Sequence, residues 1–371
     1  MSDSEVVIDG DAHINEPMDV FEQFLDEEHR GLRPKLITDT RGLTRILMDG
    51  KLYPDPRLRQ NHTKKVQGTQ LGGVQAGARD PIARLDDLDT DGIDVQVMYG
   101  SLGLATSTIA DADFAVAMAR ACNSYYASFC APDPARLKCA ATLPVQDMPA
   151  AVEEARRAVT ELGHVALTVA PTFAGRNLDD PYFHPLYALA EEVDVPISVH
   201  WGNGSHLPGA GTERFDTHFM VHAVGHPFEQ MIAFAAVVCG GVLDEFPRLR
   251  VGFLEAGCGW AAYWVERLDE HFERRSREMP KMTRTATEYV AEGNLFFSSE
   301  PDERLIPVVM DQLGTDCVFY ASDYPHTDSK FPYTVKTIRE RDDLPDGAVP
   351  KLLGGNAARY YGFDRAAAVH Q

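Results

Sequence analysis

Apolar runs rich in valine, isoleucine and phenylalanine alternate along the chain with longer stretches of helical periodicity. The β-like runs span residues 6–13, 94–100, 137–145, 164–171, 196–201, 250–257, 294–300 and 317–326. Helical patterns, with apolar positions that recur every three or four residues, fill the gaps between them. Eight strands alternating with helices over 371 residues predict a (β/α)8 TIM barrel. The alternative, a doubly wound open sheet, is less favoured because no glycine-rich nucleotide motif follows a strand.

Two insertions interrupt the alternation, after the first and the fifth strands. The first includes residues 30–80, in which Asp49-Gly50 between apolar runs is typical of a hairpin turn. The second is the glycine-rich segment 201–218. In a barrel both lie on the face that carries the active site, so we expect residues 30–80 to form a lid and both insertions to wall the site. Without a linker or a short repeat, residues 1–371 are expected to form a single domain.

The charge of the chain limits its partners. The formal net charge is -21 at pH 7 and the isoelectric point is near 5.0. Such a surface repels phosphate backbones and anionic lipid headgroups, so we expect a small-molecule substrate and neither nucleic acid nor membrane as a partner. The six cysteines show no metal-binding or disulfide spacing, and the N-terminus shows no signal-peptide pattern. These features predict a cytoplasmic enzyme with reduced thiols.

Acidic residues and histidines gather where the predicted strands end. In the first strand Asp9, Asp11 and His13 alternate, so their side chains point to one side. The fifth, sixth and eighth strands end on His200, Glu255 and Asp323. One such residue is most often a loop cap, but three on an apolar strand would cost several kcal/mol each if buried without partners. Because a barrel brings strand ends together, we predict a site for Zn²⁺, Fe²⁺ or Mn²⁺.

Four motifs in order resemble the amidohydrolase superfamily. They are D-A-H followed by N-E-P (11–17), V-H-W (199–201), F-P-R-L-R-V-G-F-L-E-A-G-C-G-W (246–260) and A-S-D-Y-P-H (321–326). The sequence is most similar to the amidohydrolase-2 branch, which contains the aminocarboxymuconate-semialdehyde and resorcylate decarboxylases. The resemblance spans almost the whole chain, and it implies a metal-dependent enzyme on a TIM barrel.

The resemblance implies roles for the strand-end residues. Asp11 and His13 match the first-strand ligand pair of the family, and His200 matches the fifth-strand ligand. Asp323 matches the eighth-strand aspartate, which binds the metal and accepts a proton from bound water in hydrolytic members. Asp9 is then expected one layer deeper, as a supporting group. One position departs from the pattern, because family decarboxylases usually have a histidine where this chain has Glu255.

Further candidates lie near the same strand ends. Glu16 and Glu255 are possible ligands of a second ion, so we expect one or two metals; for Glu16, a helix cap or salt bridge before Pro17 is an equal alternative. His218, His222 and His226 recur every four residues and share a face if helical. We expect His222 and His226 to contribute to the substrate pocket or to proton transfer, and Gly225 and Pro227 to break the helix. Trp201 is expected as an apolar wall, and His206 and His326 as loop histidines.

Three functions from different classes are compatible with these residues. The first is hydrolysis of an ester, thioester, amide or lactone by metal-activated water, with Asp323 as general base and Glu255 or His226 assisting. This interpretation is favoured because Glu255 replaces the histidine of the decarboxylases. The alternative is metal-dependent, non-oxidative decarboxylation of an aromatic or enoic acid. The third is a non-catalytic binding barrel, although none of its ligand positions is missing. Barrels of this family often form homodimers, which we also expect here.

Overall fold

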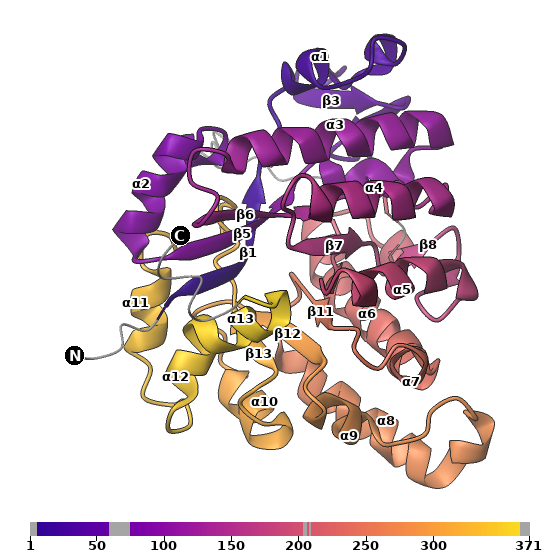
Figure 1. Cartoon of the computed structure of the whole chain (residues 1–371), viewed down its shortest axis with the longest axis vertical. Coiled ribbons are helices and arrows are strands. Elements are labelled where there is room, and N and C mark those ends of the chain that lie inside the picture. The colour runs from indigo at the N-terminus through magenta and orange to yellow at the C-terminus, as the bar shows by residue number, and fades with distance from the viewer. Residues whose placement is uncertain (1–5, 59–74, 203–205, 208, 364–371) are drawn as a thin grey trace.

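The strands close into a parallel barrel. A computed structural model of the chain describes residues 6–58, 75–202, 206–207 and 209–363. Eight strands form one sheet in the order β1-β5-β6-β7-β10-β11-β12-β13, and each neighbouring pair is parallel. Beyond the last strand, Asp323 donates to the Asp11 carbonyl at 3.0 Å and His13 donates to the Tyr324 carbonyl at 2.6 Å. These bonds join the two ends of the sheet, so the predicted TIM barrel is confirmed (Figure 1).

The predicted strand runs all contain a barrel strand. The eight strands are β1 (Ile8–Ile14), β5 (Val95–Gly100), β6 (Leu137–Ala141), β7 (Ala166–Val169), β10 (Ile197–Val199), β11 (Val251–Phe253), β12 (Leu295–Ser299) and β13 (Val318–Tyr320). Most are shorter than the apolar runs from which they were predicted. The residues of each run that follow its strand lie in the loops on the carboxyl face, which is where a barrel carries its site.

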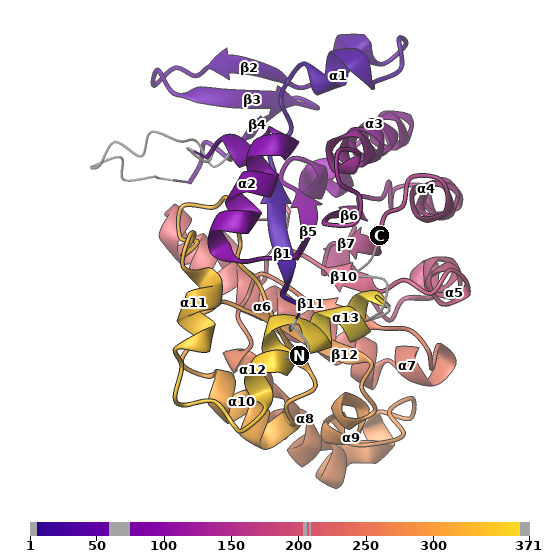
Figure 2. The ribbon, with the colours of Figure 1, turned by 60° about the vertical axis from the view of Figure 1, so that its left-hand side comes forward.

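Helices surround the barrel in the positions that the alternation predicts (Figure 2). Those between or after barrel strands are α2 (Pro81–Asp91), α3 (Ala112–Cys130), α4 (Met148–Thr160), α5 (His184–Glu192), α6 (His218–Cys239), α7 (Val242–Glu245), α8 (Gly259–Arg275), α9 (Ala286–Ala291), α10 (Ile306–Leu313), α11 (Thr334–Arg339), α12 (Ala348–Pro350) and α13 (Asn356–Tyr361). Helix α2 illustrates the local signals. The Asp80 side chain accepts from the backbone of Ile82 and Ala83, Pro81 occupies the first turn, and Gly92 ends the helix at φ 82°.

The last helix closes the barrel at the end opposite the strand termini that carry the site. Tyr360 of α13 stacks on Phe319 with ring centroids 5.2 Å apart. The Tyr361 hydroxyl donates to the Gly10 carbonyl at 2.5 Å and lies 2.7 Å from the Tyr99 hydroxyl. Buried apolar side chains and hydrogen-bonded hydroxyls therefore fill this end of the barrel. The unusual polar cluster lies at the other end, where the strands have their carboxyl termini.

The first insertion forms a small separate sheet. Strands β2 (Lys35–Thr38), β3 (Thr44–Met48) and β4 (Lys51–Tyr53) pair antiparallel and follow the short helix α1 (Val20–Gln23). The predicted hairpin at Asp49-Gly50 is confirmed, with both residues at positive φ. Figure 2 shows this sheet at the top, beyond α2 and α3. Part of the predicted lid, residues 59–74, lies outside the described residues.

The two insertions contact each other through His206. Its Nε2 lies 2.8 Å from the Leu52 carbonyl, and its Nδ1 lies 3.6 Å from an Asp55 oxygen. The ring also meets Tyr53 edge-on, with centroids 4.9 Å apart. His206 is thus a loop histidine, as predicted, and it links segments that flank the barrel mouth.

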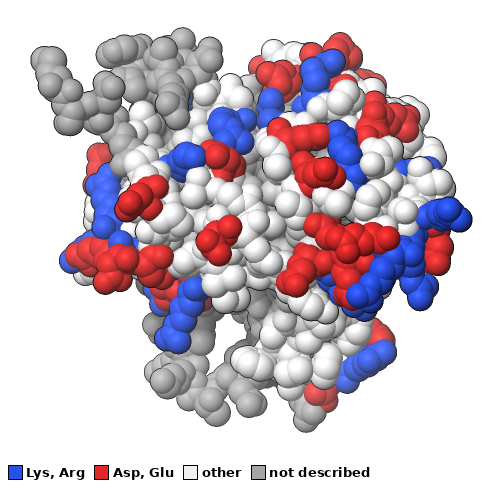
Figure 3. Space-filling model, turned by 90° about the horizontal axis from the view of Figure 1, so that it is seen from below, with Lys and Arg blue, Asp and Glu red and all other residues white. Residues whose placement is uncertain are grey.

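The cysteine side chains and the charged side chains of the surface are both features that the composition describes. The six cysteines are buried free thiols, as predicted. On the face shown in Figure 3, acidic and basic side chains are interspersed over a largely uncharged surface. Within the described part of the chain, no helix combines the length and the hydropathy needed to span a bilayer.

A minor pair of strands completes the secondary structure. Strands β8 (Thr172–Phe173) and β9 (Arg176–Asn177) form a two-residue antiparallel ribbon after β7. Arg176 lies over the Tyr182 ring, 4.8 Å from its centroid. This ribbon follows the carboxyl end of β7, so it adds to the rim of the barrel mouth.

Candidate metal centre

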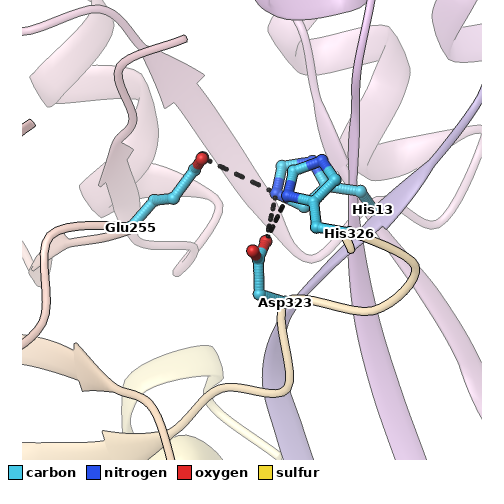
Figure 4. A group of neighbouring side chains, drawn as sticks. All are labelled: His13, Glu255, Asp323 and His326. Carbon is cyan, nitrogen blue, oxygen red and sulfur yellow. Dashed lines mark ion pairs between the residues drawn. The ribbon is translucent and has the colours of Figure 1, made fainter. Parts of the chain in front are cut away.

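Five of the predicted side chains meet at the carboxyl end of the barrel. They are Asp11 and His13 in β1, His200 after β10, Glu255 after β11 and Asp323 after β13. The Nε2 atom of His13 lies 3.3 Å from Asp323 Oδ1 and 3.7 Å from Glu255 Oε2. The Nε2 atom of His200 lies 3.1 Å from Glu255 Oε2 and 3.6 Å from Asp11 Oδ1. Figure 4 shows His13, Glu255 and Asp323 pointing toward one another from three separate segments.

The ligand atoms of this cluster are buried and lack hydrogen-bond partners. The unpartnered atoms are Asp11 Oδ1, His13 Nε2, His200 Nε2 and Glu255 Oε2. Leaving such groups unsatisfied is costly, so native proteins pair them or use them to coordinate an ion. Ligands with bonds of about 2.1 Å to one ion lie roughly 3 to 4.2 Å apart, which is the spacing observed. Two imidazoles and three carboxylates therefore fit a divalent transition metal.

Burial and mutual repulsion shift the pKa values in the cluster. Burial raises the pKa of Asp11 to about 7 and lowers that of His13 and of His200 to about 4. Burial, with the neighbouring Asp323 and Asp11 charges, holds the pKa of Glu255 well above its usual range. Neutral imidazoles are competent ligands, and a cation would favour the ionised carboxylates that now repel each other.

Asp323 forms an ion pair with His326, for which the sequence predicts only a loop position. His326 Nδ1 lies 2.7 Å from Asp323 Oδ1, and its ring stacks on His13 with centroids 4.2 Å apart. Burial lowers the pKa of His326, but the carboxylates of Asp323, Asp328 and Asp11 together outweigh burial and raise it to about 9. The pairing with His326 also holds the pKa of Asp323 below its usual range despite burial. His326 therefore belongs to the cluster and is not only a loop histidine.

Backbone geometry aims the two carboxylates that follow β11 and β13. Glu255 has φ 54° and Asp323 has φ 53°, values that non-glycine residues rarely adopt. Strained residues of this kind concentrate at functional sites, because the surrounding structure must hold them in place. The Glu255 backbone is held by its N–H, which donates to Ser298 Oγ at 3.1 Å.

A buried network lies beneath the first-strand ligands. Asp9 accepts from Gln96 Nε2 at 2.7 Å and from the Ser322 backbone at 2.9 Å. The pairing of β1 with β5 shifts register between Asp9 and Ala12, and such a bulge re-aims side chains. Asp9 thus stays out of the metal cluster and supports it, as predicted. Arg84 extends the network, because it donates to Gln96 Oε1 at 2.6 Å and to the His13 carbonyl at 2.7 Å.

The structure does not bring Glu16 to the predicted second metal position. Its carboxylate accepts from the Tyr126 hydroxyl at 2.6 Å and from the backbone of Leu102 and Gly103 at 2.9 and 3.0 Å. These three bonds use the carboxylate to fasten the loop after β5. Its place in the N-E-P motif gave no sign of this role, since Tyr126 and the loop are distant in sequence.

Helix α6 brings His222 and His226 next to the cluster. The helix runs unbroken through Pro227 from His218 to Cys239, so the predicted break is wrong. Gly225 is needed because an added Cβ would lie 2.5 Å from the Trp201 ring. His226 packs edge-on against Trp201 with centroids 4.7 Å apart and lies 4.3 Å from the His222 ring. Trp201 is thus buried against α6 beside the cluster, and its predicted role as a wall of the substrate pocket stays a prediction.

A small hollow lies beside His200; its volume of about 10 Å³ gives room for about one water molecule. The loop after β5 supplies Gly103, Leu104 and Ser107, and the ends of β6 and β7 supply further walls such as Leu143 and Val169. The hollow combines apolar and hydroxyl-bearing side chains, and it adjoins the candidate metal ligands.

Comparisons with known proteins bear on the reaction. The chain is 25% identical over 313 residues to 2-amino-3-carboxymuconate-6-semialdehyde decarboxylase of Dictyostelium discoideum, covering 81% of each chain. It is 29% identical over 322 residues to gamma-resorcylate decarboxylase of Rhodococcus jostii, covering 81% of this chain and 93% of the relative. Both relatives are decarboxylases, so the preference for hydrolysis is wrong. Glu255 in place of a histidine therefore does not indicate hydrolysis.

A solved structure gives the same picture of the fold. The 5-carboxyvanillate decarboxylase of Novosphingobium aromaticivorans, complexed with manganese and 4-hydroxy-3-methoxy-5-nitrobenzoic acid, matches with a TM-score of 0.67, 22% identity and 97% coverage of each chain. A family model described as amidohydrolase matches residues 8–363, nearly the entire chain. The chain belongs to this amidohydrolase family.

Proposed function

We propose that this chain is a metal-dependent, non-oxidative decarboxylase of an aromatic or enoic carboxylic acid. The observation that carries the proposal is the set of unpartnered ligand atoms on Asp11, His13, His200 and Glu255 at the strand ends, with Asp323 beside them. The decarboxylase relatives support the reaction type.

The charge of the site supports a role for the metal in substrate binding. Asp11, Glu255 and Asp323 place three carboxylates around the two histidines. A carboxylic acid substrate is an anion and is repelled by such a site unless a cation is present. The protein as a whole is also acidic, with a formal net charge of -21. Binding of the substrate is therefore expected to depend on the metal.

Each group then has a distinct task. Asp11, His13, His200 and Asp323 would hold the ion, in agreement with the roles that the family resemblance implies. When bound, a divalent metal supplies a Lewis acid that grips the substrate carboxylate and a neighbouring oxygen.

Asp323 and His326 are placed to supply the proton that replaces carbon dioxide. The bond between the substrate carbon and its carboxylate breaks, carbon dioxide leaves, and the carbon takes a proton. His326 Nδ1 is 2.7 Å from Asp323 Oδ1, and despite burial the carboxylates of Asp323, Asp328 and Asp11 raise the pKa of His326 to about 9. The pair therefore holds a proton at neutral pH, next to the ligand atoms.

The experiment that tests this function measures carbon dioxide release. Protein stripped with a chelator and reloaded with Mn²⁺ is incubated with 2,6-dihydroxybenzoate, 5-carboxyvanillate and an enoic diacid, and carbon dioxide is quantified with the organic product. We expect equal amounts of both from at least one acid, and a fall in kcat of about 100-fold or more for Asp323→Asn.

A control separates the site from general effects of mutation. His271 is exposed on α8, and its Nδ1 lies 2.9 Å from the Arg267 carbonyl, away from the cluster. His271→Ala is expected to keep full activity. Absence of carbon dioxide from every acid with metal-loaded protein, or equal rates for wild type and Asp323→Asn, would contradict the proposal.

We propose a cytoplasmic homodimer that acts on small molecules, as the family resemblance and the acidic composition suggest. Light scattering coupled to size-exclusion chromatography tests the dimer directly, because the chain has a mass of 41.0 kDa. A peak at the monomer mass across working concentrations would refute it.

A further inference from the structure

A second group of ligand atoms lies beside the first. His222, His226 and Glu255 each offer a nitrogen or oxygen within 4.8 Å of the others. The two histidines lie on α6 and take no part in the cluster of Asp11, His13, His200 and Asp323. Glu255 belongs to both groups.

The tautomer of His226 is set by its backbone contact. Its Nδ1 lies 2.6 Å from the Glu255 carbonyl oxygen, so Nδ1 carries the proton and donates it. Nε2 is then left with a free lone pair. That atom is buried without a partner, and the residue is only 2% exposed. A histidine that donates one ring N–H to a carbonyl and points its other nitrogen into a site is arranged as metal ligands usually are.

The two oxygens of Glu255 face different groups. Oε2 lies 3.1 Å from His200 Nε2, toward the first cluster. Oε1 lies 4.0 Å from His226 Nε2, toward α6. The second distance is too long for a hydrogen bond, yet it fits two ligands of one ion with bonds of about 2.1 Å. In Figure 4 the carboxylate of Glu255 reaches toward His13 from the left, and that of Asp323 from below.

We propose that His222, His226 and Glu255 bind a second divalent transition metal ion, with Glu255 bridging it to the ion of the first cluster. Imidazole and carboxylate ligands suit Zn²⁺, Mn²⁺ or Fe²⁺, and three protein ligands leave a position open to water or substrate. The second ion expected from the sequence thus takes two histidines of α6 in place of Glu16.

The second site does not depend on the reaction proposed above. It requires only that the ligand atoms around Glu255 be occupied, whichever substrate the protein uses. Two bridged ions would lie about 3.5 to 4 Å apart, a separation known in two-metal sites. This closeness gives a spectroscopic signature, since two Mn²⁺ ions at that distance are magnetically coupled.

Metal stoichiometry tests the proposal. Full-length protein is stripped with a chelator, saturated with Mn²⁺, freed of excess by gel filtration and analysed by plasma mass spectrometry and electron paramagnetic resonance. We expect two ions per chain with a coupled spectrum in wild type. His226→Ala and, separately, His222→Asn are expected to retain one ion with an uncoupled spectrum. His222 is the milder change because its side chain is only partly buried.

Two further variants make the result specific. His218 lies one turn before His222 on α6 and outside the ligand group, so His218→Ala is expected to keep two coupled ions. His13→Ala removes a ligand of the first cluster alone. The second site would be overturned if wild type held one ion that was lost in His13→Ala and retained in His222→Asn. That result would not contradict the proposed function. Two ions in both α6 variants would overturn it as well.

Discussion

Arg84 offers a sharp test of how the scaffold holds the metal ligands. The side chain is fully buried in α2, and its guanidinium makes three hydrogen bonds, to the Gly77 carbonyl at 2.7 Å, to Gln96 Oε1 at 2.6 Å and to the His13 carbonyl at 2.7 Å. It also lies over the Tyr324 ring, 4.4 Å from the centroid. One cation thus fastens the first-strand ligand and the loop after β13 at once.

Replacing this residue by methionine keeps much of the volume and removes all three donors. Each charged hydrogen bond contributes about 1.5–3 kcal/mol, and breaking a buried charged network costs about 3–5 kcal/mol in total. For a chain of 371 residues, a loss of about 4 kcal/mol corresponds to a fall in Tm of roughly 5 °C. Because the His13 backbone loses its anchor, the Kd for Mn²⁺ should also rise about 10- to 100-fold.

Calorimetry of unfolding and isothermal titration with Mn²⁺ measure the two effects of Arg84→Met. Arg156→Met is the matched control, because Arg156 forms an exposed pair with Glu192 at 2.8 Å. Exposed pairs contribute about 0–1 kcal/mol, so neither Tm nor Kd should change appreciably. If Arg84→Met behaved like this control in both measurements, the supporting role assigned to the network would be refuted.

Three further predictions concern metal, pH and packing. Removing a metal ion whose free concentration is 100 times its Kd should lower Tm by about 3–4 °C. Differential scanning fluorimetry should show a smaller fall in Tm when metal is removed from His13→Ala. Burial lowers the pKa of His164 to about 4, below its value in the unfolded chain. The free energy of unfolding should therefore fall by about 3 kcal/mol as pH falls from about 6.5 to 4, and urea titrations of His164→Gln should show a smaller fall. A Cβ added at Gly100 would lie 1.7 Å from the Tyr126 hydroxyl, whereas a Cβ added at Gly31 would contact no atom within 4 Å. In the same titrations Gly100→Ala should lower the free energy of unfolding by about 1–3 kcal/mol, and Gly31→Ala by far less.

The barrel and the meeting of its strand-end side chains could be predicted because both depend on local pattern. Alternating apolar runs mark parallel strands, and a barrel always gathers the ends of those strands on one face. Asp11, His13, His200, Glu255 and Asp323 lie at such ends, so their convergence follows from topology alone. Asp9 was correctly set apart from them, although the bulge that separates it is visible only in the register of β1 and β5.

Other features depend on contacts between distant segments. Glu16 is turned from the metal by Tyr126, 110 residues away, so its position in the chain gave no indication of its partner. Helix α6 continues through Pro227, and Gly225 beside it allows close approach to Trp201, a contact that sequence signals for helix ends do not include. His326 had a usable signal, because it follows Asp323 by three residues in a turn and lies within reach of its carboxylate.

The reaction type was the least predictable part. Glu255 at a strand end favours hydrolysis when only the sequence is considered, yet the relatives are decarboxylases. Imidazoles and carboxylates that suit a divalent metal do not by themselves separate the two reactions.

The most direct test of the central claim follows the proton in deuterated water. Metal-loaded protein is incubated with hydroxylated benzoates in D₂O, and the product is analysed by mass spectrometry and NMR. The account predicts one deuteron at the carbon that lost its carboxylate, one carbon dioxide per product, and loss of both in Asp323→Asn. Cleavage of acyl donors without carbon dioxide release or deuterium on carbon would contradict it.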